Sequence, residues 1–260
     1  MTEILAIVPA RGGSKGIPRK NLLRIAGKPL VAHSIEHGLA CRRVTRTIVS
    51  TDDDEIAEVA RAFGADVPFR RPAEHATDLA TDLAVFHHAL AWLKEHEGYE
   101  PELVVHLRPT DPVRSPARID EAIELMLARP EADSLRSMAI APHTPYKMWR
   151  IDDGYLVPLL TLPGIAEAHS MPRQLLPPVY AHTGYVDVIR PRTIHGGSMV
   201  GHVVLPFVLD EPAYDLDYPH QIAAIERALT GLERPERRST PPAATVGSAR
   251  ATSEFPAGQP

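Results

Sequence analysis

The chain has 260 residues, of which 44% are apolar and 23% charged, and its formal net charge is −5. This length and composition suffice for one large α/β domain or two small ones, and the acidic balance gives no electrostatic reason to expect a nucleic acid partner. The single cysteine, Cys41, excludes an intramolecular disulfide, a zinc ribbon and a CxxC redox motif. No apolar run reaches the ~18 residues of a membrane span. We therefore expect a globular cytoplasmic protein without a membrane partner.

The first half of the chain alternates short apolar runs with helical patterns. Residues 4–8 are typical of a parallel strand buried on both faces, and a helix is predicted at 29–35, where a proline occupies the first turn. The further predicted elements are a strand at 47–51, a helix whose N-terminus is capped within Asp52-Asp53-Asp54, a helix at 81–97, a strand at 103–107 and a helix at 116–129 capped by Ser115. This alternation predicts an α/β fold with a mostly parallel central sheet and helices on both faces.

The pattern changes at about residue 140. Prolines become frequent, and Asp153-Gly154 separates the apolar stretches 148–151 and 155–157 as in a β-hairpin. We expect a smaller insertion at about 140–182 with its own antiparallel piece. The earlier pattern then resumes with a strand at 184–189, an apolar run at 203–209 and a helix at 219–232. One domain is thus predicted over 1–232, followed by a disordered tail at 233–260 that is rich in Pro, Ser, Thr, Ala and Gly.

The loop after the first strand combines glycines with basic residues. Glycines let backbone N–H groups converge on a phosphate, and cations neutralise its charge, so this loop predicts a polyphosphate site. It is neither a Walker A loop nor a GxGxxG loop. The alternative is a basic surface turn, which is disfavoured by the position just past the carboxyl end of a central strand. The glycines are Gly12, Gly13 and Gly16, and the basic residues are Arg11, Lys15, Arg19 and Lys20.

Two further segments carry candidate chemistry. Asp215 and Asp217 are one residue apart, so their carboxylates point the same way and suit Mg²⁺ shared with phosphates, although such a pair can also be merely solvated or cap the next helix. Arg108 and Arg114 follow the strand at 103–107 and so emerge at the same rim as the glycine loop. They could hold an acidic group by paired hydrogen bonds, or belong to a proline-stiffened turn with exposed charges.

Together these segments resemble the CMP-sialic acid synthetase family, the acylneuraminate cytidylyltransferases that activate nonulosonic acids with CTP. The similarity covers about residues 1–230. Its most specific part runs from Ile7 to Asn21 and is close to the family signature ARxGSKGxxxKN, with supporting matches at 71–74, 109–114, 173–174 and 215–217. The resemblance implies a Rossmann-like nucleotidyltransferase fold. It also implies a homodimer in which the insertion reaches over the partner's active site.

The resemblance further implies a role for each matching residue. CTP would be held by Ala10, Arg11, Gly12, Gly13, Ser14, Lys15, Lys20 and Asn21, and its cytosine read by Arg71 and the backbone near Ala80. Asp215 and Asp217 would hold Mg²⁺, and Arg11, Lys20 and Asp217 would be the catalytic residues. Arg108, Arg173 and Gln174 would face the acceptor. The implied reaction is transfer of CMP from CTP to an acidic acceptor, with pyrophosphate as the leaving group.

The sequence departs from the family on the acceptor side. Arg108 stands where the family usually has a glutamine, and His182-Thr183-Gly184-Tyr185 replaces the common Asn-Gly-Ala. A fixed cation with bidentate reach suits a carboxylate, a phosphonate or a phosphate. Two acceptors therefore stay open: a nonulosonic acid, giving a CMP-sugar, or a small phosphonate such as phosphonoformate in natural-product biosynthesis. A non-catalytic nucleotide-binding protein is a third alternative, which loss of Lys20 or of the metal carboxylates would indicate, and both are intact.

Overall fold

The computed structural model describes residues 2–231, so the end of the last predicted helix at 232 and the predicted tail lie outside the described residues. The central sheet has the strand order β10-β6-β9-β5-β1-β4. β1 pairs in parallel with β4 and β5, and β10 pairs in parallel with β6, whereas β9 is antiparallel to β5 and β6. The predicted mostly parallel sheet is confirmed. Its strands are β1 (Ile4–Pro9), β4 (Arg46–Ser50), β5 (Leu103–His106), β6 (Ser134–Ile140), β9 (Tyr180–Ile189) and β10 (Val204–Val208).

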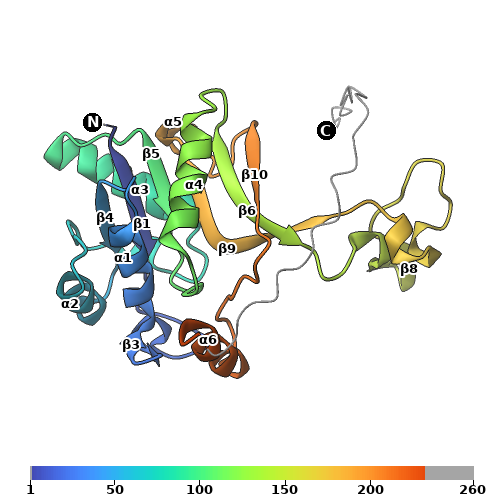
Figure 1. Cartoon of the computed structure of the whole chain (residues 1–260), viewed down its shortest axis with the longest axis horizontal. Coiled ribbons are helices and arrows are strands. Elements are labelled where there is room, and N and C mark those ends of the chain that lie inside the picture. Colours follow the sequence, from blue (N-terminus) through green and yellow to red (C-terminus); the bar gives the residue numbers. More distant parts are fainter. Residues whose placement is uncertain (1, 232–260) are drawn as a thin grey trace.

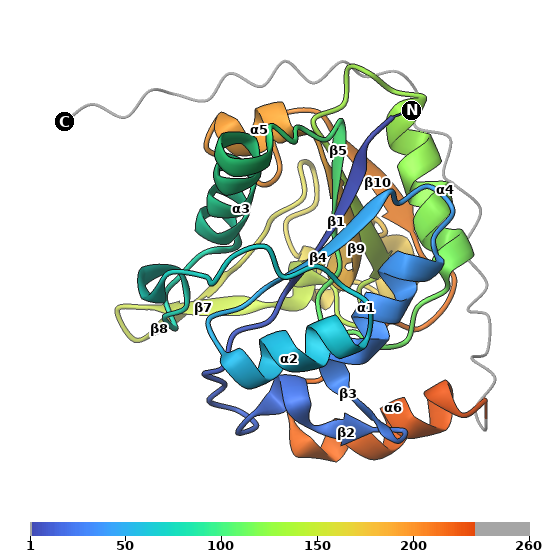
Figure 2. The same ribbon diagram turned by 90° about the vertical axis from the view of Figure 1, so that its left-hand side faces the viewer.

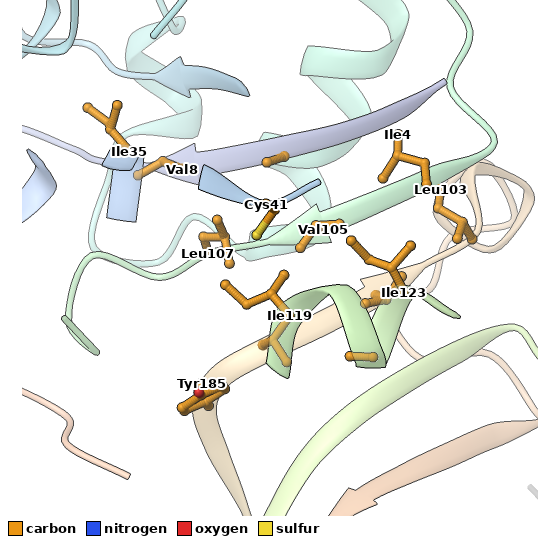
Figure 3. Close-up of a cluster of buried hydrophobic side chains, with 14 of the residues drawn as sticks. Ile4, Val8, Ile35, Cys41, Leu103, Val105, Leu107, Ile119, Ile123 and Tyr185 are labelled. Carbon is orange, nitrogen blue, oxygen red and sulfur yellow. The ribbon is translucent and has the colours of Figure 1, made fainter. Parts of the chain in front are cut away.

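Helices cover both faces of this sheet (Figure 2). β1 contributes alternate residues to two cores: Ile4 and Val8 pack with the helices of one face, and Leu5 and Ile7 pack with α3 on the other. Figure 3 shows the first core, where side chains of α4 meet those of β5. α1 (Leu30–Ala40), α2 (Asp54–Ala62) and α4 (Pro116–Leu127) cover the first face, and α3 (Asp82–Glu97) and α5 (Pro191–His195) cover the second.

Local details refine the predicted elements. Asp53 caps α2, with its Oδ1 accepting from the Ile56 amide at 3.0 Å, as predicted. Ser115 occupies the N-cap position of α4, but its side chain makes no capping hydrogen bond, so that part of the prediction is wrong. The last predicted helix is a short 3-10 turn, Pro219–Gln221, followed by α6 (Ile222–Leu229). β9 begins four residues earlier than predicted because the chain pairs with the far end of β6 before it reaches the buried part of the sheet.

The segment between β6 and β9 projects from the sheet (Figure 1). It carries the predicted hairpin, formed by β7 (Trp149–Asp152) and β8 (Tyr155–Pro158), with Asp153 and Gly154 both at positive φ in the turn. A second small hairpin, β2 (Arg24–Ile25) with β3 (Lys28–Pro29), lies next to α6. Within residues 2–231, the helices are all too short or too polar to cross a membrane.

Candidate active site

A cavity of about 290 Å³ opens beyond the carboxyl ends of β1 and β5. From β1 the chain crosses to β4 on one side and then to β5 on the other, so this is the point where the strand order reverses. Open α/β sheets bind ligands at such a crevice because the loops leaving the two strands diverge there. Among the residues that line it, four are cationic and two are carboxylates, so the cavity favours an anion. These are Arg11, Lys20, Arg71 and Arg108, and Asp78 and Asp82.

The glycine loop is fixed by two side chains from elsewhere in the chain. The amide of Gly12 donates to Asp52 Oδ1 at 2.9 Å, and Asn21 Nδ2 donates to the carbonyl of Arg11 at 2.9 Å. A Cβ on Gly12 would lie 2.6 Å from Asp53 Oδ2, so only glycine allows the loop to pack this closely on the start of α2. Asp52 was predicted to serve only as part of a helix cap, and the structure shows that it also anchors the loop.

Lys20 connects this loop to the predicted metal carboxylates. Its ammonium donates to the carbonyl of Leu216 at 2.8 Å and lies 3.4 Å from Asp217 Oδ1. Leu216 is fully buried while Asp215 and Asp217 on either side of it are exposed. A Cβ on Gly16 would come within 3.0 Å of the Asp217 carbonyl, so the loop and the Asp215-Asp217 segment are in close contact. Lys20, 196 residues away in sequence, therefore brings the two predicted groups together.

Asp78 neutralises two of the predicted phosphate-binding cations. Its carboxylate lies 3.0 Å from Arg11 Nη1 and 2.6 Å from Lys15 Nζ, and Arg11 also donates to the carbonyl of Thr77 at 2.7 Å. The hydrogen bond from Lys15, with the nearby charge of Arg11, lowers the pKa of Asp78. The Asp78 carboxylate is thus paired with the two cations, Arg11 and Lys15, that a phosphate group would need.

Replacing Asp78 by asparagine is expected to tighten CTP binding about two- to fivefold, because a triphosphate then no longer competes with this exposed carboxylate for Arg11 and Lys15. Calorimetric titration with CTP would measure this. Glu74→Gln is the matched control, since Glu74 is an exposed carboxylate of the same segment for which the described structure gives no ion pair. Weaker CTP binding by Asp78→Asn would mean instead that Asp78 holds Arg11 in its binding position.

Arg71 and Ala80 line the deeper wall of the cavity. Arg71 is almost fully buried, and its guanidinium donates to the side chain of Ser50 at 3.0 Å and to the Ser50 carbonyl. Burial lowers the pKa of Arg71 to about 10, which still leaves it charged at neutral pH. The Ala80 amide donates to the Thr77 carbonyl at 3.2 Å, so this part of the wall is a closed turn.

Arg108 also lines the cavity, but its charge is already paired. Its Nη1 donates to Asp187 Oδ2 at 2.8 Å and its Nη2 to Asp82 Oδ2 at 3.3 Å. Asp187, in β9, is nearly fully buried and also accepts from His182 Nε2 at 2.9 Å. Arg108 therefore reaches the cavity as predicted, but two carboxylates distant in sequence, which the sequence did not reveal as its partners, share its guanidinium.

Arg114 has a structural environment rather than a place at the rim. It is buried, and its guanidinium donates to Ser34 Oγ at 2.9 Å and to the carbonyls of Arg108, Gly184 and Tyr185. The idea that it pairs with Arg108 around an acidic ligand is thus wrong, since all its contacts hold strand ends together. Beside it lies Asp111, whose carboxylate oxygens make no hydrogen bond of ordinary geometry; burial raises the pKa of Asp111 to about 7.

The structure brings most of the predicted nucleotide residues to one cavity. Those that line it are Arg11, Ser14, Lys20, Asn21, Arg71 and Ala80, and Arg108, which was predicted to face the acceptor, lines it as well. Arg173 and Gln174 do not line it: they lie exposed in the projecting segment, where Arg173 donates to the Ala141 carbonyl at 3.0 Å. Sequence reasoning missed four acidic residues of the site, namely Asp52, Asp78, Asp82 and Asp187. Each has a local explanation as a cap, a loop or a strand residue, so only an observed pairing could have distinguished it.

Comparison with known proteins gives a consistent assignment. The family model described as "Cytidylyltransferase" matches residues 5–148. The flagellin modification protein B of Campylobacter coli is 30% identical over 220 residues, which cover 84% of this chain and 91% of that protein. The N-acylneuraminate cytidylyltransferase of Escherichia coli is 40% identical over 124 residues, covering 48% of this chain but only 28% of the relative. The chain thus spans less than a third of that protein's length.

Two further similarities concern about half of the chain and the fold. The CMP-N,N'-diacetyllegionaminic acid synthase of Legionella pneumophila is 42% identical over 126 residues, which are 47% of this chain and 53% of the relative. Among solved structures, a CMP:2-keto-3-deoxy-manno-octonic acid synthetase in complex with CTP superimposes with a TM-score of 0.65 over 89% of this chain and the whole of the other, at 16% identity. At that identity the superposition shows a common fold.

Proposed function

The chain belongs to the cytidylyltransferase family, and from this premise we propose that it transfers CMP from CTP to a nonulosonic acid and releases pyrophosphate. The observation that carries the proposal is the cationic cavity at the switch point of the sheet, where Lys20 joins the glycine loop to Asp217. The cations neutralise charge on CTP and on the departing pyrophosphate, and a nearby carboxylate can hold a divalent cation that does the same.

Different residues of the cavity would bind the triphosphate and the cytosine base of CTP. Arg11, Lys20 and the glycine loop would hold the triphosphate, with Asn21 keeping the loop in shape through the Arg11 carbonyl. Arg71 is too buried and too well bonded to move, so it suits a fixed contact to the base at the deep end of the cavity. Positioning and electrostatics would supply most of the rate enhancement, as in other phosphoryl transfers.

The carboxylates fit a magnesium site on their donor chemistry. Asp215 and Asp217 present exposed oxygen ligands beside the glycine loop, and Mg²⁺ is typically held by one or two carboxylates together with substrate phosphates and water. Bound there, the ion would neutralise charge on the phosphates. Within residues 2–231 no group of three or more histidine, cysteine or acidic side chains forms a metal site, so this ion would depend on CTP for its remaining ligands.

A nonulosonic acid is the better supported acceptor. The sequence argument for a phosphonate depended on the fixed cation of Arg108, and that charge is paired with Asp187 and Asp82. Two of the relatives, the N-acylneuraminate cytidylyltransferase and the CMP-N,N'-diacetyllegionaminic acid synthase, have a sugar acid in their names, which supports the same acceptor class here.

Pyrophosphate release with CTP and Mg²⁺ tests this proposal. The acceptor panel would contain N-acetylneuraminic, N,N'-diacetyllegionaminic, pseudaminic and 3-deoxy-manno-octulosonic acids, with phosphonoformate as a separate arm. Release with at least one sugar acid is expected. Release with phosphonoformate alone would overturn the acceptor class, and CTP binding without release from any acid would favour a non-catalytic nucleotide-binding protein.

We also propose that two copies of the chain form a dimer through the projecting segment. The β7–β8 hairpin exposes apolar side chains: Ile151 (77% exposed) and Leu156 (65% exposed) are cross-strand partners on one face of it. Monomeric proteins seldom leave such a patch in water, and a second copy of the same hairpin would bury it. Further exposed apolar residues of this segment are Tyr155, Leu159, Leu160 and Leu175.

A double substitution should separate the copies. The wild type is expected to sediment as a dimer, and Ile151→Glu with Leu156→Glu as a monomer, because two glutamates at the centre of an apolar interface leave charges without partners. Leu125→Glu, on the exposed side of α4, is the control and should leave the dimer intact. A wild type that is monomeric in analytical ultracentrifugation at micromolar concentration would refute the proposal.

A further inference from the structure

A bulge in β9 places His182 directly on Asp187. Between the pairs Arg136 with Asp187 and Met138 with His182, β6 has one residue and β9 has four. Ser137 fills the bulge: its Oγ accepts from the Val186 amide at 3.0 Å and from Thr183 Oγ1 at 2.8 Å. Bulges often re-aim a side chain beside an active site. Here residues five apart in one strand, which would otherwise lie on opposite faces, meet at 2.9 Å.

The charge of Asp187 fixes which nitrogen of His182 is free. Burial alone would raise the pKa of Asp187, but the hydrogen bond from His182 and the Arg108 guanidinium reverse this and hold it well below its usual range. An ionised carboxylate only accepts hydrogen bonds, so His182 Nε2 must carry the proton in this contact. In the neutral imidazole the lone pair is then on Nδ1. Such a carboxylate–histidine pair is the usual way to orient a proton acceptor.

His182 also lies at the edge of the sheet where the cavity opens. Because β9 runs antiparallel to β5 and β6, its first residues are at the carboxyl edge where Arg108 lines the cavity. The side chain of His182 is 33% exposed, so it is accessible to a ligand. His106, the other histidine near Asp187, is fully buried, and burial together with the Arg108 charge lowers its pKa to about 3. His106 therefore gains no proton at neutral pH.

Several charged groups surround the pair formed by His182 and Asp187. Arg108 contacts Asp187 from the loop after β5, and Asp82 contacts Arg108 from α3. Arg136 of β6 is directly opposite Asp187 in the strand ladder. Asp187 is therefore never left as an isolated buried carboxylate, whether His182 is neutral or protonated.

We propose that His182 accepts the proton of the attacking hydroxyl of the acceptor, with Asp187 as its positioning residue. The inference rests on the proposed CMP transfer. As the acceptor oxygen forms its bond to the α-phosphorus, its hydrogen passes to His182 Nδ1, and the bond from that phosphorus to the pyrophosphate oxygen breaks. Pyrophosphate leaves with the electron pair of that bond, and His182 later returns its proton to water. Neither an oxidant nor a reductant is needed.

The kinetic test compares His182→Gln with the wild type on the sugar acid that supports pyrophosphate release. A general base contributes about 10²–10⁴-fold, so kcat should fall by about that factor while the KM for CTP changes less than about threefold. The pH–rate profile of the variant should lack the acid limb that a protonatable base gives the wild type. His195→Gln, an exposed histidine after the other end of β9, is the control. A variant that retains more than a third of wild-type kcat, or the same acid limb, would refute the proposal.

A second measurement does not depend on turnover. In histidine-labelled protein, NMR should show His182 as the Nε2–H tautomer in the wild type, and this preference should be lost in Asp187→Asn. The Nδ1–H tautomer in the wild type would overturn the inference by itself. If no sugar acid supports release by the wild type but phosphonoformate does, both proposals fail, because a phosphonate oxygen brings no hydroxyl proton. If the wild type releases pyrophosphate with a sugar acid and His182→Gln does so at the same rate, only the assignment of the proton acceptor is wrong and the proposed function stands.

Discussion

Replacing Asp217 by asparagine is expected to lower the rate of pyrophosphate release by roughly 10²–10³-fold, as for the loss of one preorganised electrostatic contact to a transition state. The substitution removes a negative oxygen ligand from the proposed magnesium site without changing the size of the side chain. The Asp217 side chain is 58% exposed, and its recorded contact is to Lys20 at 3.4 Å, so the folded state should be as stable as the wild type. Initial rates at saturating CTP and Mg²⁺ would measure the loss.

A binding measurement separates this role from a general effect on the cavity. Without metal, CTP should bind Asp217→Asn at least as tightly as the wild type, because Lys20 is released from its carboxylate partner. Asp210→Asn is the matched control: Asp210 is a half-exposed carboxylate at the start of the same segment, 3.7 Å from Arg118. Equal turnover of Asp217→Asn and the wild type would show that the metal is held elsewhere.

Replacing Arg114 by methionine is expected to lower the free energy of unfolding by about 3–5 kcal/mol, the usual cost of removing one member of a buried charged network. Three backbone carbonyls and the Ser34 hydroxyl would lose their donor, and the neighbouring Asp111 would lose the cation that stabilises its charge. Urea unfolding followed by circular dichroism would give the difference.

Arg129→Met provides the comparison for this stability effect. Arg129 is 61% exposed and lies 3.9 Å from Glu131, so its removal should cost less than about 1 kcal/mol. Arg114→Lys should be nearly as damaging as the methionine, because an ammonium cannot span the carbonyls of Arg108, Gly184 and Tyr185 at once. A loss of less than about 1 kcal/mol in the free energy of unfolding for Arg114→Met would contradict this prediction. It would mean that the Arg114 guanidinium donates to water rather than to these carbonyls.

The acceptor side shows most clearly where sequence reasoning stops. Arg108 and Arg114 are the ends of one seven-residue segment and are equally plausible ligands for an acid when read as a sequence. In the structure one lines the cavity with its charge paired, and the other is buried and bonded to backbone. The difference arises because the segment turns inward after Arg108, and no local pattern encodes that turn.

The fold and the glycine loop were determined by local sequence. Apolar runs define β1, β4 and β5 because a buried parallel strand has no polar face, and the loop that follows β1 packs closely on the start of α2 because Gly12 has no Cβ atom. The turn Asp153-Gly154 specified its hairpin through positive φ angles alone. Each of these signals operates within a few residues.

Only the tertiary structure decided which charges neutralise one another. Lys20 meets Asp217 across 197 residues, Arg108 meets Asp187 across 79, and Asp78 reaches back to Arg11. The bulge that turns His182 onto Asp187 likewise depends on the register between β6 and β9. Electrostatic pairing depends on distance in space, and an acidic side chain carries the same charge whether it caps a helix, clamps an arginine or binds a metal. The sequence by itself therefore determined the sheet and the glycine loop. The assembled fold determined which ionised side chains pair with one another.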